Sequence, residues 1–142
     1  MKISIRQITE KDVCYLYDSL FDKNIRGFSL NQQKVSYESH CEYWKKRLSN
    51  NQNKDYIIVC DGSRNVGCVR IDPDGQISIA VDKEFQGKGF GSIALDLAIK
   101  ESKLKEYSSK ILSKNTTSKK LFKKLGFKKQ YEVYTLSKIN ST

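Results

Sequence analysis

Three glycines, Gly87, Gly89 and Gly91, stand at alternate positions in the stretch VDKEFQGKGFGS, directly before a predicted helix. Glycine lets backbone N–H groups turn toward a ligand and approach it closely. Those amides and the positive end of the helix dipole favour a bound anion, and Lys88 adds a full positive charge beside them. The stretch therefore predicts a cradle for a pyrophosphate group.

The glycine spacing differs from that of two common phosphate-binding loops. A Walker loop needs G-x-x-x-x-G-K-S/T, and a dinucleotide-binding fold needs G-x-G-x-x-G inside a βαβ unit. Neither pattern occurs in the chain. A glycine-rich turn with no ligand is the alternative, because G-x-G alone is a weak signal. The residues around the loop must decide between the two.

The hexapeptide Gln86-Gly87-Lys88-Gly89-Phe90-Gly91 resembles the Q/R-x-x-G-x-G/A signature of the GNAT superfamily of N-acetyltransferases. Further residues look like that family's second motif, an Asn, a small residue three positions later, an aromatic residue and then Gly-Phe: Asn115, Ser118, Leu121, Phe122 and Leu125-Gly126-Phe127. Both motifs occur in the family's order and separation, over the last half of the chain. The resemblance implies a GNAT-like α+β fold, a single domain over residues 1–142, and transfer of an acetyl group from acetyl-CoA to an amine.

The resemblance also implies where coenzyme A would lie. The backbone of residues 79–81 would pair with the pantetheine arm as an added strand, and the amides of residues 87–92 would hold the pyrophosphate. Asn115 would hydrogen-bond the pantetheine arm, while Lys119, Lys120 or Lys123 could approach the phosphates, although a solvated helix face also explains these lysines. The expected coenzyme residues are Ile79, Ala80, Val81, Gln86, Gly87, Lys88, Gly89, Phe90, Gly91, Ser92, Asn115, Ser118 and Phe122. No metal is expected.

The groups that would move protons are the least defined part of the site. Many family members use a carboxylate or an ordered water to deprotonate the amine, but the strand before the loop offers Gln76 and Ser78. Phe122 stands where the family often has a tyrosine that protonates the coenzyme thiolate. Tyr131 and Tyr134 are the candidate replacements. Otherwise solvent supplies the proton, or the domain binds an acyl-CoA without efficient catalysis.

A histidine and a tryptophan indicate where an acceptor could bind. His40 precedes Trp44 by four residues on a predicted helix, so their side chains can be neighbours. The stretch from residue 27 to residue 50 is similar to the S-x-x-E-H-x-x-x-W-like region of nucleotide-sugar amine acetyltransferases. A core histidine beside a packed tryptophan is the alternative. An amino-sugar nucleotide is the expected acceptor, and a protein N-terminus or lysine is the second choice.

The elements that would position these residues follow from apolar periodicity. Alternation of apolar and polar residues predicts a strand in ISIRQI, and runs rich in strand-favouring residues predict strands in DYIIVC, VGCVRI and QISIAV. We further expect a short strand around KILS and a final strand pair in FKKQYEVYTLSK. Helical spacing predicts helices after Thr9, from Ser36 to Leu48, from near Ser92, and in TTSKKLFKKL with Gly126 as its C-cap. Mixed elements without a regular β-α repeat indicate an α+β domain with a central, mostly antiparallel sheet flanked by helices.

Composition narrows the class of protein further. The net charge of +10 favours an anionic ligand or partner, yet we find no aromatic residues interleaved with Lys and Arg as nucleic-acid binding would need. The four cysteines have no C-x-x-C spacing and are expected to be reduced, buried thiols. No apolar run approaches a membrane span and no signal peptide is evident, so the cytoplasm is the expected location and no membrane partner is expected. The oligomeric state cannot be read from the sequence.

Overall fold

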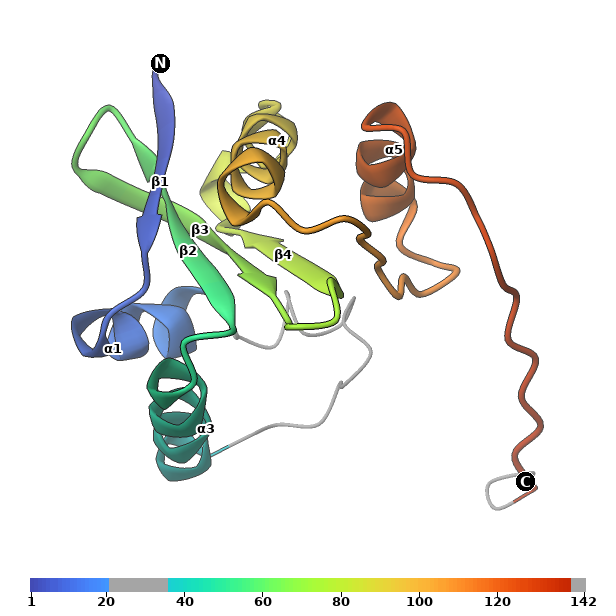
Figure 1. Ribbon diagram of the computed structural model, residues 1–142, viewed down its shortest axis with the longest axis horizontal. Coiled ribbons are helices and arrows are strands. Elements are labelled where there is room, and N and C mark those ends of the chain that lie inside the picture. Colours follow the sequence, from blue (N-terminus) through green and yellow to red (C-terminus); the bar gives the residue numbers. More distant parts are fainter. Residues whose placement is uncertain (21–35, 139–142) are drawn as a thin grey trace.

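The computed structural model describes residues 1–20 and 36–138 and contains a four-stranded sheet with helices on both faces (Figure 1). The strands lie in chain order: β1 (Ile3–Gln7), β2 (Lys54–Cys60), β3 (Arg64–Ile71) and β4 (Ile77–Val81). Each strand pairs antiparallel with the next. The predicted α+β class and the mostly antiparallel sheet are confirmed.

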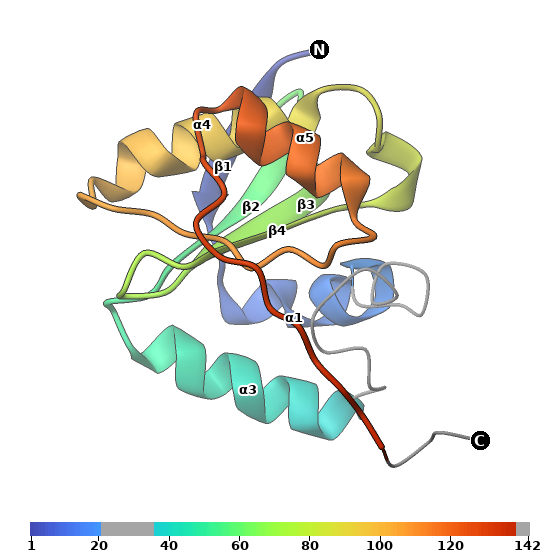
Figure 2. The same cartoon turned by 90° about the vertical axis from the view of Figure 1, so that its right-hand side faces the viewer.

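The helices form one layer on each face of the sheet. Below the sheet in Figure 2 lie η1 (Glu10–Asp12), α1 (Val13–Tyr15), the π-helical turn η2 (Leu16–Leu20) and α3 (Tyr37–Ser49). Above it lie α4 (Phe90–Ser102) and α5 (Thr116–Lys124), and the short 3-10 helix η3 (Lys83–Phe85) connects β4 to the loop before α4. Each layer buries its own hydrophobic cluster against the sheet. Because both faces are covered, β2 is buried from Asp55 to Cys60.

Local sequence signals place the helix ends correctly. Ser36 caps α3, since its hydroxyl oxygen accepts a hydrogen bond from the Ser39 backbone N–H at 3.1 Å. The Asp12 carboxylate accepts from the backbone N–H of Thr9 at 2.8 Å, as the predicted cap requires. Gly126 follows α5 with a φ of 95°, a left-handed conformation that glycine adopts without strain. These ends depend only on residues a few positions apart.

The strands predicted after α4 are wrong. No strand forms around KILS; the contact lies earlier, where Ser108 makes a single parallel bridge to Gln76 beside β4. Residues 127–138 form no strand pair, and residues 128–138 are all exposed. A hairpin there would need a tight turn, but FKKQYEVYTLSK contains no Gly, Pro, Asn or Asp to make one. The segment has the composition of a strand, but within the described part of the chain no strand pairs with it.

The cysteines follow the prediction only in part. All four are free thiols, and Cys60 and Cys68 are buried in the sheet. Cys41 is half-buried and Cys14 is exposed, so the expectation that all four are buried is wrong. Residues 27–35 of the predicted acceptor stretch lie outside the described residues. Within the described ranges, no helix is long and apolar enough to cross a membrane.

Candidate active site

β4 is the last strand of the sheet and bonds to β3 along one side only. Two backbone hydrogen bonds fix its orientation: Asp72 N–H donates to Gln76 O at 2.9 Å, and Asp82 N–H donates to Val66 O at 2.8 Å. Backbone groups of alternate residues in an antiparallel strand face the same side. The even-numbered residues of β4 therefore bond to β3. Ala80 is one of them, so its backbone groups face β3. This differs from the expectation that the backbone of all of residues 79–81 faces the outer side.

The odd-numbered residues of β4 direct their backbone groups away from β3. Ile77 N–H donates to Ser108 O at 2.7 Å, and Val81 O accepts from the Gln86 side-chain amide at 3.0 Å. This leaves the N–H and C=O of Ile79 and the N–H of Val81 on a strand edge that no other strand in residues 1–20 and 36–138 covers. Such an edge can bond an extended amide-containing ligand as it would bond another strand.

Aromatic contacts hold both ends of the loop that follows β4. The Asp82 side chain accepts a hydrogen bond from the Glu84 backbone N–H at 3.4 Å, which begins η3. The ring of Phe85 stacks on the ring of Phe90 with centroids 6.2 Å apart, and the Arg64 guanidinium lies 4.7 Å from the centroid of Phe85. Phe90 is buried beneath the loop, whereas residues 86–89 are exposed. The loop is therefore anchored at its two ends and open in the middle.

The open part of the loop has the backbone conformation of an anion-binding turn. Gly87 and Gly89 have φ values of 78° and 81°, which other residues adopt only with strain. Gly89 is the N-cap of α4, and the first amide that reaches a carbonyl within the helix is that of Ile93, 3.4 Å from Gly89 O. The amides of residues 90–92 thus begin the helix without an intrahelical acceptor. With exposed Lys88 beside them, they fit a pyrophosphate group.

Gly91 brings β4, α4 and α5 together. A Cβ atom at Gly91 would lie 3.5 Å from Leu121 of α5, and 3.6 Å from both Ile79 and Val81 of β4. These are ordinary van der Waals distances, so an alanine would fit here, in agreement with the Gly/Ala alternative in the family signature. The close contact places the beginning of α4 against the side chains of β4 and next to α5.

α5 begins at the second predicted motif. Asn115 is its N-cap, and the Asn115 side-chain oxygen accepts a hydrogen bond from the Ser118 backbone N–H at 3.1 Å. Ser118 is therefore fixed as part of the cap. The ring of Phe122 points into the core, where it is 4% exposed and meets Phe127 edge-on at 4.9 Å. The coenzyme contacts expected of Asn115, Ser118 and Phe122 remain predictions. For Phe122, packing in the core is sufficient to explain an aromatic residue at this position.

The sequence model of the Acetyltransferase (GNAT) family matches residues 18–127. This chain belongs to the GNAT acetyltransferase family. The uncharacterized protein MJ1062 of Methanocaldococcus jannaschii is 31% identical over 140 residues, which cover 90% of this chain and 28% of that protein. The chain thus spans little more than a quarter of the length of that relative. GNAT acetyltransferases use acetyl-CoA, and the resemblance seen in the sequence is confirmed at the level of the family.

Solved structures support the same assignment. A domain from Methanocaldococcus jannaschii has a TM-score of 0.79 at 30% identity and covers 93% of this chain and 92% of that one. A spermidine N-acetyltransferase from Vibrio cholerae in complex with CoA and spermine has a TM-score of 0.78 at 18% identity, covering 91% and 82% of the two chains. At 18% identity the second likeness shows a shared fold.

The GNAT domain does not bring its candidate proton-transfer residues together. Ser78 is half-buried on β4 directly opposite Arg70 of β3, on the face that α3 covers. Tyr131 and Tyr134 lie on the exposed segment after α5, where they are 86% and 87% exposed. The Tyr134 hydroxyl donates to the Glu132 carboxylate at 2.5 Å. Both tyrosines are separated from the loop because the strands that were expected to carry them back to the sheet do not form.

His40 and Trp44 lie in the core between α3 and the N-terminal helices. Their ring centroids are 6.3 Å apart, so the expected proximity is confirmed. His40 is 5% exposed with its Nε2 3.1 Å from Val13 O, and Trp44 is fully buried. In this arrangement Trp44 has no exposed surface and His40 has very little. Their placement agrees with the alternative of a core histidine beside a packed tryptophan, and an acceptor contact through them remains only a prediction.

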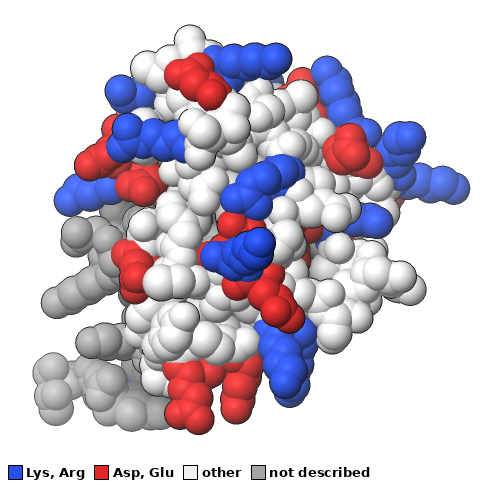
Figure 3. All heavy atoms as spheres, turned by 90° about the vertical axis from the view of Figure 1, so that its left-hand side faces the viewer, with Lys and Arg blue, Asp and Glu red and all other residues white. Residues whose placement is uncertain are grey.

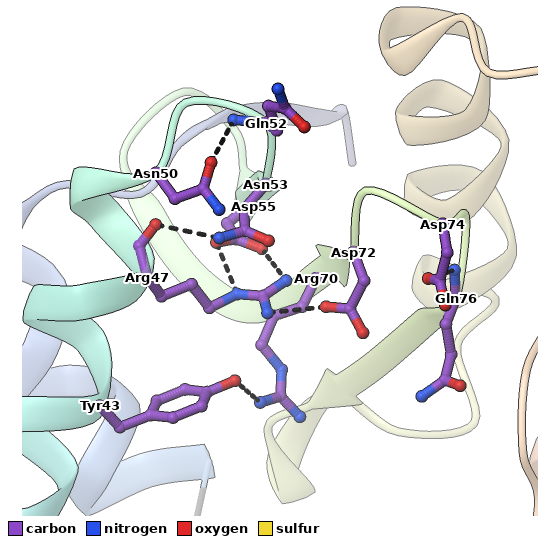
Figure 4. A network of polar contacts seen from close by, with 10 residues as sticks. All are labelled: Tyr43, Arg47, Asn50, Gln52, Asn53, Asp55, Arg70, Asp72, Asp74 and Gln76. Carbon is purple, nitrogen blue, oxygen red and sulfur yellow. Dashed lines mark hydrogen bonds and ion pairs between the residues drawn. The ribbon is translucent and has the colours of Figure 1, made fainter.

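An ion-pair network that sequence analysis did not identify joins α3 to the sheet (Figure 4). Arg47 of α3 donates two hydrogen bonds of 2.8 Å to Asp55 of β2 and one of 2.7 Å to Asp72 after β3. The side chains of Arg47 and Asp55 are 11% and 5% exposed. Burial alone lowers the pKa of Arg47, but the bonds to the two carboxylates outweigh it and raise that pKa. The signal in the sequence for the Arg47–Asp55 pair was Asp55 itself, a charged residue at the start of the apolar run DYIIVC, which needs a partner when it is buried.

A second contact of α3 lies beside the network. Arg70 donates to the Tyr43 hydroxyl at 2.9 Å, so α3 also holds the side chain next to Ser78 in the sheet. On the molecular face that lies at the left of Figure 1, basic and acidic side chains are interspersed (Figure 3). That face therefore shows no single positive stripe of the kind that nucleic acid would need. No group of three or more potential ligand residues within the described ranges could hold a metal ion.

Proposed function

We propose that this GNAT domain is an acetyl-CoA-dependent N-acetyltransferase that acts on the primary amine of a small molecule, with amino-sugar nucleotides as the preferred class of acceptor. One observation carries the proposal: an uncovered edge of β4 leads directly into a left-handed glycine loop at a helix N-terminus. The first feature suits the amides of a pantetheine arm and the second suits a pyrophosphate. Coenzyme A contains both groups in that order.

The chain's own residues would hold the coenzyme through backbone groups. Ile79 offers an N–H and a C=O to an extended ligand, and Val81 offers an N–H. The first-turn amides of α4 and Lys88 would hold the phosphates. The bond from the Gln86 side chain to Val81 O fixes the direction in which the chain leaves the strand. When bound, acetyl-CoA supplies the activated acetyl group, and these residues orient it along β4.

Deprotonation of the acceptor favours an amine of low pKa. β4 carries Ser78, and Gln76 directly precedes it, in place of a carboxylate, so the described site has no strong base on this strand. An amine with a pKa near ~10.4, as in lysine, must lose a proton before it can attack. Electron-withdrawing ring oxygens lower the pKa of a sugar amine and reduce this requirement. A nucleotide diphosphate would in addition match the net charge of +10.

A non-catalytic acyl-CoA module is the second candidate, and the burial of Phe122 favours it. A phenyl ring has no proton to give to the coenzyme thiolate, and this ring is 4% exposed. Tyr131 and Tyr134, the other candidate donors, lie on the segment after α5 and are 86% and 87% exposed. For the enzyme, the proton would then come from solvent. A protein N-terminal or lysine acetyltransferase remains the other enzymatic possibility that the acceptor assay must include.

Calorimetric titration tests coenzyme binding, and coenzyme release tests catalysis. We expect acetyl-CoA and desulfo-CoA to bind similarly and ATP to bind much more weakly, because ATP has phosphates but no pantetheine arm. Equal binding of ATP would reduce the loop to a general anion site. Release of free coenzyme would then be followed with amino-sugar nucleotides, polyamines and peptides. Selective binding without release on any acceptor would support the non-catalytic module.

A further inference from the structure

Two of the four free cysteines lie on neighbouring helices. Cys14 is on α1 and is exposed, and Cys41 is on α3 and is half-buried. Each directly follows a residue through which the two helices meet, because His40 Nε2 lies 3.1 Å from Val13 O. Both cysteines line one groove on the surface between α1 and α3. The other two cysteines are buried in the sheet, so this pair is the one that a reagent in solution can reach.

A single tyrosine hydroxyl reaches both thiols of this pair. Tyr37 lies one helical turn before Cys41 on α3 and lines the same groove. Its hydroxyl hydrogen-bonds with the Cys41 thiol, and this bond is the main cause that raises the pKa of Tyr37. The same hydroxyl hydrogen-bonds with Cys14, and the ring of Tyr17 meets the Tyr37 ring edge-on at 5.1 Å. Because one oxygen atom contacts both sulfur atoms, the two thiols are neighbours.

A carboxylate keeps the exposed thiol of the pair protonated. Cys14 Sγ donates a hydrogen bond to Asp18 Oδ2 at 3.3 Å. This bond and the negative charge of Asp18 are the two largest causes that raise the pKa of Cys14. The thiolate is the form of cysteine that attacks a disulfide, so a raised pKa slows that attack near neutral pH. The pair is therefore expected to be reduced at low levels of oxidant.

We propose that Cys14 and Cys41 form an oxidation site that takes a low-molecular-weight disulfide as its oxidant and closes into a bond between α1 and α3. The Cys14 thiolate attacks one sulfur atom of the oxidant R–S–S–R, and the first R–S⁻ leaves and takes up a proton. Cys41 loses its proton to solvent and attacks the Cys14 sulfur of the mixed disulfide, which releases the second R–SH. The chain loses two hydrogen atoms and the oxidant gains them.

The new bond would join the two helices that cover the face of the sheet opposite α4 (Figure 2). It closes a loop of chain between these helices and so lowers the entropy of the unfolded state. We expect the oxidised chain to melt several degrees above the reduced chain, and dithiothreitol to reverse the shift. An oxidised chain that melts at or below the temperature of the reduced chain would show that the bond does not fit the native packing of α1 on α3, and would overturn the proposal.

The deciding experiment follows the mass of the fully reduced chain in dilute solution with oxidised glutathione. Wild type is expected to lose two hydrogen atoms and to yield, on digestion, one linked pair of peptides that carry Cys14 and Cys41. Cys41→Ser is expected to stop at a stable glutathione adduct on Cys14, and both chains should have the same helix content by circular dichroism. A wild-type chain that keeps both thiols, that holds a lasting adduct, or that links only to a second chain would overturn the proposal.

A second pair of variants tests the step at Cys14. Asp18→Asn removes the charge that raises the pKa of Cys14, so the bond is expected to form severalfold faster near neutral pH. Glu10→Gln is the matched control: Glu10 lines the same groove, but the carboxylate that accepts from Cys14 is that of Asp18. We expect its rate to equal that of wild type. A rate that Asp18→Asn leaves unchanged would overturn the attack by Cys14, and no coenzyme or acceptor enters either measurement.

Discussion

Replacing Gly89 with alanine separates the conformational role of the loop from general stability. Gly89 has a φ of 81° and no atom within 4 Å of the position that a Cβ would take. The substitution therefore creates no clash, and its cost is backbone strain of roughly 1–2 kcal/mol in the left-handed region. The loop can relieve that strain by rotating, which would turn the first-turn amides of α4 away from the coenzyme phosphates.

The magnitude follows from the hydrogen bonds that would be lost. A hydrogen bond to a charged group contributes about 1.5–3 kcal/mol. Loss of one such bond to a phosphate weakens binding by roughly 10- to 100-fold. We therefore expect the Kd of acetyl-CoA, measured by calorimetry, to rise by that factor in Gly89→Ala. Unfolding by urea should show a loss of about 1–2 kcal/mol in the same variant.

Gly62 provides a matched control in the turn between β2 and β3. Its φ is 80°, and a Cβ there would also meet no atom within 4 Å. Gly62→Ala should therefore lose a similar amount of stability and keep its affinity for acetyl-CoA. Wild-type affinity in Gly89→Ala would refute the assignment of the loop as a phosphate cradle. An equal loss of affinity in both variants would show that destabilisation, and not the loop, was measured.

Four further predictions concern residues around the site and the core. Arg47→Ala should lose about 3–5 kcal/mol in urea unfolding because it leaves the buried Asp55 carboxylate unpaired, and adding Asp55→Asn should restore part of that loss. Burial raises the pKa of Asp12, but hydrogen bonds from Arg6 and from the Thr9 backbone amide outweigh it and lower that pKa. The resulting stabilisation is complete above about pH 4 and is lost as the pH falls through the lowered pKa. Acid unfolding curves of wild type and Asp12→Asn should therefore converge at low pH. Phe122→Tyr should leave acetyl-CoA affinity unchanged and lose roughly 1–3 kcal/mol of stability by burying a hydroxyl, and an unaltered melting temperature would show that the hydroxyl finds a partner. Asn115→Ala should cost about 1 kcal/mol by removing a helix cap, whereas Asn115→Asp keeps the cap, so a loss of acetyl-CoA affinity in Asn115→Asp without a loss of stability would indicate a direct coenzyme contact.

The sequence determined the features that depend on neighbouring residues. The glycines at positions 87 and 89 permitted a left-handed backbone before a helix, and both have it. Ser36 and Gly126 marked helix ends through contacts made within a few positions. Alternation in the first strand, and runs rich in strand-favouring residues in the next three, identified the four strands that form the sheet. Because these features arise from local backbone conformation and side-chain periodicity, they could be read without knowing what covers each element.

Only the tertiary structure decided which side chains are accessible and which segments pair. Phe122 and Trp44 could have faced a ligand, but packing between helices and sheet turns both into the core. Arg47 meets Asp55 and Asp72 because the fold brings α3 beside the ends of β2 and β3. Residues 128–138 have a strand-like composition but form no strand within the described part of the chain, since strand pairing depends on an edge being within reach and not on composition. The burial of a side chain and the pairing of a strand depend on how the elements pack together, so they cannot be read from the residue order within one element.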